Sequence, residues 1–70
     1  MMEKLLIKDD FIKLGQALKL CGIAQSGVDA KMMIINGEVK YNGQVETQRG
    51  KKLYEGDTFE ADGRVFQVVK

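Results

Sequence analysis

The apolar positions near the start of the chain change their spacing within the first twenty residues. Residues 3–8 carry three consecutive apolar side chains between charged ones, which predicts a short strand or a leader. A stripe with helical steps of three, four and three follows, formed by Phe11, Leu14, Leu18 and Cys21. Asp9 and Asp10 precede the stripe as N-cap candidates, and Gly22 follows it. We therefore expect a first helix between Asp10 and Gly22.

A second helical stripe follows after a short connection. Its apolar positions are Val28, Met32 and Ile35, widened by Ala30, Met33 and Ile34. Ser26 is the predicted N-cap, and Asp29 three residues later gives a weaker form of the capping box. Asn36 and Gly37 tolerate the left-handed backbone with which helices often end. The first half of the chain is therefore expected to be a pair of short helices.

Beyond the helices the sequence favours hairpins. Val39–Tyr41 predicts a strand, and the following Asn42-Gly43 pair is the strongest short signal for a type I′ turn. Residues 44–46 would form the returning strand. The whole chain then reads as α+β, with two short helices packed on a small antiparallel sheet.

A second hairpin is predicted near the C-terminus. Residues 58–61 and 64–69 are short apolar-rich segments separated by an Asp-Gly pair. A two-residue turn between them would place Phe59 opposite Phe66 on one face. That cross-strand pairing supports the register of the hairpin.

Composition narrows the function classes. The chain has 70 residues, 44% of them hydrophobic and 30% charged, which is typical of one small globular domain spanning residues 1–70. A chain of this size rarely encloses a deep substrate pocket, and no nucleophile–base pair or cofactor motif is present. We therefore expect a binding module with no cofactor rather than an enzyme.

The residue inventory also limits location and metal chemistry. One cysteine and no histidine exclude an intrachain disulfide, a Cys/His zinc site and a histidine-based triad. The longest apolar run, Met32–Ile35, is too short to span a membrane, and no signal peptide is recognisable, so a cytoplasmic protein is expected. Cys21 is interpreted as a core residue. The acidic side chains near the C-terminus would scatter over both faces of a hairpin, so no metal site is expected.

Charge is distributed unevenly along the chain. Residues 1–30 sum to zero, residues 31–52 to +3 and residues 53–70 to −2. The basic third contains the polar loop Thr47–Lys52. A basic segment of this kind is typical of an anion-binding face.

The order of these signals resembles a known family. A Ser-initiated helix from Ser26, the segment Ile34–Gly43 with its Val-x-x-Asn-Gly pattern, and Gly56-Asp57 before a strand occur in the S-four-like RNA-binding domain, also called the alpha-L motif. The resemblance covers about residues 10–60. Within the family, the chain is most similar to the small stand-alone bacterial proteins of the YbcJ/YaaA type.

The resemblance implies binding of structured RNA, with ribosomal RNA or a ribosomal particle as the partner and no small-molecule substrate. Lys31 matches a basic position of the family's second helix, whereas Gly27 stands where the family usually has Arg. Recognition would be mainly of phosphate position and shape. The candidate RNA-binding residues are Ser26, Gly27, Lys31, Lys40, Asn42, Gln44, Thr47, Gln48, Arg49, Lys51 and Lys52.

Alternatives remain for several of these residues. Ser26 can be an ordinary helix cap, and Asn42 and Gly43 can be turn residues. On one helix, Lys13 and Lys19 would point about 240° apart, so Lys13 is left out and Lys19 is only marginal. The alternative function is a protein–protein adaptor without direct RNA binding, which would depend on exposed apolar residues such as Tyr54 or Val65.

Overall fold

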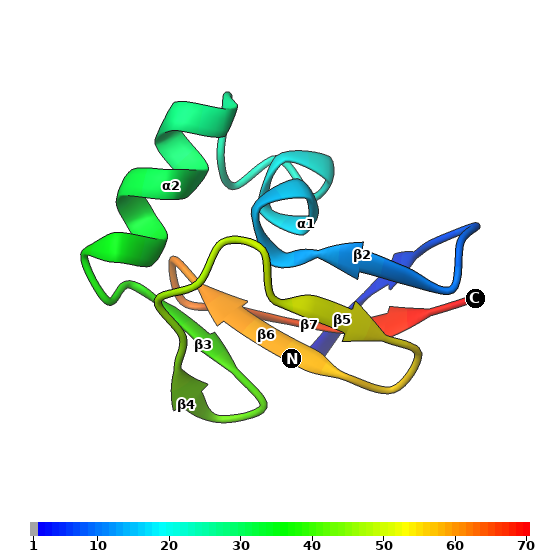
Figure 1. Ribbon diagram of the computed structural model, residues 1–70. Coiled ribbons are helices and arrows are strands. Elements are labelled where there is room, and N and C mark those ends of the chain that lie inside the picture. Colours follow the sequence, from blue (N-terminus) through cyan, green and yellow to red (C-terminus); the bar gives the residue numbers. More distant parts are fainter. Residues whose placement is uncertain (1) are drawn as a thin grey trace.

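The computed structural model describes residues 2–70 and arranges them as two helices and two sheets (Figure 1). The helices are α1 (Leu14–Leu20) and α2 (Gly27–Ile35). The strands are β1 (Met2–Leu6), β2 (Phe11–Lys13), β3 (Val39–Tyr41), β4 (Gln44–Val45), β5 (Lys52–Tyr54), β6 (Thr58–Ala61) and β7 (Arg64–Val69). The predicted α+β class with a helix pair is confirmed. No helix within residues 2–70 is long and apolar enough to cross a membrane.

The larger sheet is mixed rather than purely antiparallel. Its strand order is β1-β7-β6-β3-β4, and β1 runs parallel to β7 while the other pairs are antiparallel. Of the strand or leader expected over residues 3–8, the strand is confirmed as β1; Leu5 within it and Ile7 just after it are buried. Its partner β7 is more than fifty residues away in the sequence, so the sequence pattern around β1 gave no indication of the parallel pairing.

Both predicted hairpin turns are confirmed. Asn42 and Gly43 adopt φ values of 48° and 88°, as a type I′ turn requires. Phe59 lies opposite Phe66, and their rings stack with centroids 5.1 Å apart. These hairpins place β6 and β7 at the centre of the sheet, under the helices (Figure 1).

The first helix begins later than predicted. Phe11–Lys13 form β2, which pairs with β5 in a two-stranded ribbon, and α1 starts only at Leu14. Asp9 and Asp10 are not its caps. The first backbone N–H groups of α1 donate instead to the carbonyl oxygens of a distant loop, so tertiary contacts replace the expected local cap. Gly22, with φ of 85°, follows the end of α1 as predicted.

The second helix has the predicted ends but not the predicted buried face. Ser26 Oγ accepts a hydrogen bond from Asp29 N at 3.1 Å, which confirms the N-cap. The predicted apolar stripe is exposed, with Val28 69%, Met32 50% and Ile35 55% accessible. Ala30 and Ile34, which were predicted only to widen that stripe, face the core instead. The predicted buried face was wrong because the helix is apolar on most sides, so the periodicity of its sequence did not distinguish one face.

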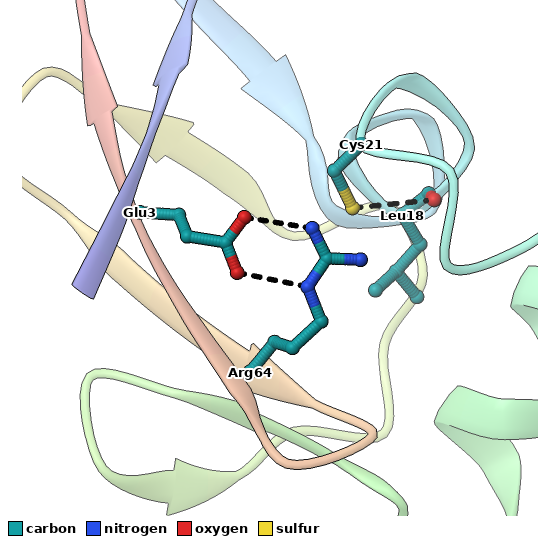
Figure 2. Close-up of polar contacts among 4 residues, drawn as sticks. All are labelled: Glu3, Leu18, Cys21 and Arg64. Atoms are coloured by element: carbon teal, nitrogen blue, oxygen red, sulfur yellow. Dashed lines mark hydrogen bonds and ion pairs between the residues drawn. The ribbon is translucent and has the colours of Figure 1, made fainter. Parts of the chain in front are cut away.

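One hydrophobic core joins the helices, the ribbon and the larger sheet. Its largest fully buried side chains are Phe59, Leu14, Leu18, Ile34, Leu53, Val39 and Val68. Cys21 is half-buried and packs against this core, as its position on the stripe predicted. Its thiol donates to Leu18 O at 3.4 Å (Figure 2).

An ion pair fastens β1 to β7 beside the C-terminal end of α1 (Figure 2). Arg64 donates from Nε and Nη2 to the two carboxylate oxygens of Glu3, at 2.8 and 2.7 Å. These hydrogen bonds hold the pKa of Glu3 below its usual value of 4.5 and raise the pKa of Arg64. Both side chains are about two-fifths exposed, so the pair makes only a modest contribution to stability.

Replacement of Glu3 by glutamine is expected to lower the melting temperature slightly at neutral pH. The carboxylate has a lowered pKa in the folded state, so its stabilising effect is present at neutral pH and is lost as the pH falls through that pKa, below 4.5. Melting curves of both proteins over a pH series check this. A difference that stays constant into acid would contradict the assigned role of the pair.

Candidate nucleic-acid interface

A shallow hollow lies where α1, α2 and the loop before β5 meet. It has a volume of about 340 Å³, and Lys13, Lys19 and Arg49 are its charged lining residues. Lys13 is the last residue of β2, Lys19 lies near the end of α1, and Arg49 belongs to the loop. Gly27, the first residue of α2, also lines it. Three cations from three separate segments therefore surround one depression, which we call the basic hollow.

Backbone hydrogen bonds hold the loop against the start of α1. Leu14 N donates to Lys51 O at 2.9 Å, and Gly15 N donates to Arg49 O at 3.0 Å. Gly15 lies against the loop, and a Cβ added to it would make an ordinary van der Waals contact with that same carbonyl oxygen at 3.6 Å. The backbone of Arg49 is therefore fixed relative to α1, although its side chain is exposed.

The ribbon of β2 and β5 adds another cation beside the basic hollow. Lys13 and Lys52 lie directly opposite each other, as do Phe11 and Tyr54. Opposite residues and alternate residues of a strand share a face, so these four side chains stand together. Lys52 Nζ lies 4.7 Å from the centroid of the Phe11 ring. Leu53 is on the other face and is fully buried.

These cations have no acidic partners among the described residues. The ion pairs found within residues 2–70 are Glu3–Arg64 and Asp10–Lys70, and neither involves the residues around the basic hollow. Like charges placed opposite each other in a sheet are destabilising. The Lys13–Lys52 pairing therefore leaves positive charge that a bound anion would neutralise.

The start of α2 borders the same region. Ser26 is the helix cap, with its Oγ accepting from the Asp29 backbone, and Gly27 lines the basic hollow. Lys31 lies four residues beyond Gly27, one turn along the same side of α2, and is exposed. We use the term basic surface for Lys13, Lys19, Lys31, Arg49 and Lys52.

Thr47 and Gln48 lie in the loop that leads to Arg49, and both are exposed. The backbone N–H of Gln48 donates to a Glu46 carboxylate oxygen at 3.1 Å, and Lys51 N donates to Gln48 O at 3.1 Å. These bonds shape the loop. They leave the Gln48 side chain at the surface, next to Arg49 in sequence.

Three other predicted site residues lie away from the basic hollow. Lys40 is on β3, directly opposite Glu60, and Gln44 is on the edge strand β4. Lys51 is half-buried, and its Nζ lies 4.8 Å from the centroid of the Tyr41 ring. The structure therefore separates Lys51 from its sequence neighbour Lys52, which extends over Phe11.

Asn42 is held in a network between the two hairpins. Its Oδ1 accepts from Thr58 N at 2.8 Å, and its Nδ2 donates to Asp57 at 3.3 Å. Asp57 also accepts from Tyr54 N at 2.8 Å and from the Tyr41 hydroxyl at 3.4 Å. Burial first, and then the Asp57 charge, raise the pKa of Tyr41 above 10.0. These contacts favour the interpretation of Asn42 as a turn residue.

Replacement of Asn42 by alanine is therefore expected to cost about 1–2 kcal/mol in the free energy of unfolding. The change removes the hydrogen bonds to Thr58 and places alanine at a φ of 48°. Urea unfolding measures the loss, and Gln44→Ala on the exposed edge strand is the matched control. RNA affinity should stay within about twofold. A tenfold loss of affinity with unchanged stability would show that Asn42 is a ligand.

Sequence reasoning left out Lys13 and treated Lys19 as marginal. It placed both lysines on one helix, where their directions diverge. Lys13 instead ends β2, just before α1, and this brings both side chains to the basic hollow. The signal that could have shown this is that Phe11-Ile12-Lys13 and Lys52-Leu53-Tyr54 each place an aromatic residue at one end and a lysine at the other, although three residues are a short pattern for predicting a strand.

Comparisons with known proteins agree with the resemblance seen in the sequence. Residues 5–69 match the S4 domain family model. The chain is 43% identical over 70 residues to the probable ribosome maturation protein RlbA of Bacillus subtilis, with 99% of both chains covered. It is 40% identical over 62 residues to the putative RNA-binding protein YbcJ of Escherichia coli, with 89% of both covered.

A solved structure also matches closely. The solution structure of YbcJ from E. coli, described as revealing an alpha-L motif involved in RNA binding, has a TM-score of 0.69 and 38% sequence identity. The match covers 99% of this chain and 86% of the solved one. The similarity therefore extends over the helices, the ribbon and the larger sheet together.

Proposed function

Because this chain belongs to the S4 domain family, we propose that it binds structured RNA through the basic surface, and that this RNA is ribosomal. The observation that carries the proposal is the gathering of Lys13, Lys19 and Arg49 around one hollow, none of them in an ion pair of the described residues. Unpaired cations at fixed positions suit a series of phosphates. Their neutralisation of RNA releases condensed counterions, which drives binding at low salt.

The geometry favours recognition of RNA shape over base sequence. The basic surface is made of lysines and one arginine around a shallow hollow. Such side chains contact phosphate and ribose oxygens, which fix orientation but carry no sequence information directly. A-form RNA is recognised mostly in this way, across its backbone and shallow groove. The proposed role is binding, with no catalytic step.

The relatives indicate which RNA to test first. One is named as a probable ribosome maturation protein and another as a putative RNA-binding protein. We extend this to a role in the cytoplasm on ribosomal RNA within a ribosomal particle or an assembly intermediate. This part of the proposal rests on similarity and not on the site geometry.

The adaptor function remains the second candidate, because α2 exposes an apolar stripe. Val28, Met32 and Ile35 are each at least half exposed on one side of the helix. Tyr54 is 48% exposed, whereas Val65 is half-buried and less suited to docking. An adaptor would lose its partner when this stripe is made polar. Its partner binding would not change when the cations of the basic surface are removed.

Fluorescence anisotropy with a labelled hairpin from ribosomal RNA, measured over a salt series, tests the proposal. We expect binding at low salt with a log–log slope of roughly −2 to −4, which corresponds to a few phosphate contacts. A double-stranded DNA of equal length is the control for charge alone. No binding to the RNA at low salt, or a slope near zero, would contradict RNA binding through the basic surface.

A further inference from the structure

A second and larger hollow adjoins the basic hollow along α1. It has a volume of about 640 Å³ and is formed between α1 and the connection from β1 to β2. Its walls are largely apolar, with Leu6, Phe11 and Leu20 among the lining residues. Leu6 is 67% exposed and Leu20 is 60% exposed, so the fold leaves both leucines in contact with water. We call this depression the apolar hollow.

The apolar hollow and the basic hollow share two lining residues. Gln16 and Lys19 line both, and they lie three residues apart on the outer side of α1. Lys8 lines the apolar hollow as well, so two lysines, Lys8 and Lys19, stand at its rim. The charged backbone of a ligand bound to the basic surface would therefore run past the mouth of the apolar hollow.

We propose that the apolar hollow receives one unpaired base of the bound RNA, next to phosphates held by the basic surface. The inference rests on the proposed function and specifies its substrate as structured RNA with a bulged or looped-out nucleotide. The flat face of a base is apolar enough to cover Leu6 and Leu20, and its ribose phosphate would lie near Lys19. A looped-out base loses its stacking partners and regains contact area in such a site.

Polar groups at the rim suit the edge of a base. The Gln16 side chain offers an amide donor and an acceptor, and Asp9 offers a carboxylate acceptor. Both residues are exposed, so their polar groups are accessible to a ligand. An apolar segment of a partner protein would also cover the leucines, but it would gain nothing from the two rim lysines, of which Lys19 also belongs to the basic surface.

Two RNA hairpins of identical stem sequence test the inference. One carries a single bulged 2-aminopurine, and the other has the same nucleotide paired. We expect the protein to bind the bulged hairpin at least about fivefold more tightly, the lower end of what stacking one base contributes. The 2-aminopurine fluorescence should change on binding only in the bulged hairpin, because only that base can enter the hollow.

The variant Leu6→Ser/Leu20→Ser should reduce the preference for the bulged hairpin to less than about twofold while leaving affinity for the paired hairpin unchanged. Both leucines are exposed, so the fold should be retained, which circular dichroism checks. The matched control Val28→Ser/Ile35→Ser removes equally exposed apolar side chains on α2 and should keep the preference.

The outcomes separate the two proposals. If both hairpins bind equally to the wild type, or if the leucine variant keeps the full preference, the apolar hollow is not a base site and RNA binding stands. A leucine variant that instead loses a protein partner from a ribosomal particle would assign the hollow to protein docking and overturn the inference. If neither hairpin binds at low salt, the proposed function fails and the base site fails with it.

Discussion

The double variant Lys13→Ala/Arg49→Ala is expected to bind a ribosomal RNA hairpin about 10- to 100-fold more weakly than the wild type at low salt. The two cations come from β2 and the loop, and both line the basic hollow. Each hydrogen bond from a cationic side chain to a phosphate is charge-assisted and contributes more than a neutral one. Removal of two should also flatten the log–log salt slope by about 2.

The matched control is Lys40→Ala/Lys51→Ala. It removes the same net charge, but Lys40 stands opposite Glu60 on the sheet and Lys51 lies over Tyr41. Neither lysine lines the basic hollow, so affinity should fall by less than about threefold. Anisotropy titrations of both variants over a salt series give the comparison. Equal losses would mean that the net charge of the protein, and not the basic hollow, governs binding.

The variant Leu53→Ala is expected to lower the free energy of unfolding by about 2–5 kcal/mol. Leu53 is fully buried at the centre of β5, and only three residues pair β5 with β2. The substitution leaves a cavity beneath the ribbon that carries Lys13 and Lys52. For a chain of 70 residues, this loss is a large part of the total stability.

Urea unfolding of Leu53→Ala and of Val45→Ala measures this effect. Val45 is 56% exposed on the edge strand, so its truncation should change stability by no more than about 0.5 kcal/mol. The RNA affinity of Leu53→Ala should fall as well, because separation of β2 from β5 would displace Lys13 and Lys52. A loss below about 1 kcal/mol for Leu53→Ala would contradict the ribbon's assigned place in the core.

The elements that sequence predicted well are those defined by local chemistry. Ser26 before an apolar run marks a helix start, because its hydroxyl accepts from a backbone N–H three residues on. Asn42 and Gly43 mark a hairpin, because both must adopt positive φ. These signals involve residues within a few positions of each other, so the sequence displays them directly.

The elements that sequence missed depend on distant partners. The strand β1 was predicted, but its parallel pairing with the distant β7 was not, and β2, which pairs with β5 about forty residues away, was missed. The start of α1 is set by the loop carbonyls of Arg49 and Lys51. Propensity is a weak indicator where a tertiary contact supplies the hydrogen bonds, so the helix was drawn one turn too long at its N-terminal end.

The error at the start of α1 also affected the predicted site, because it placed Lys13 on a helix. Once Lys13 belongs to a strand and not to a helix, its direction no longer opposes that of Lys19, and both line the basic hollow. Arg49 and Lys52 were included because the loop is basic, and they remain part of the basic surface. Lys51 was included as part of the same loop and Lys40 as a cation of the basic third of the chain, but the pairing of β3 and the packing on Tyr41 place them elsewhere.

Chemical-shift mapping by NMR tests the central claim most directly. Titration of the labelled protein with the ribosomal RNA hairpin should move the backbone amide signals of residues 13–19, 27–31 and 48–52. Signals from the β3–β4 hairpin, residues 39–45, should stay in place. Shifts confined to that hairpin, or to the exposed stripe of α2 without the loop, would contradict binding at the basic surface.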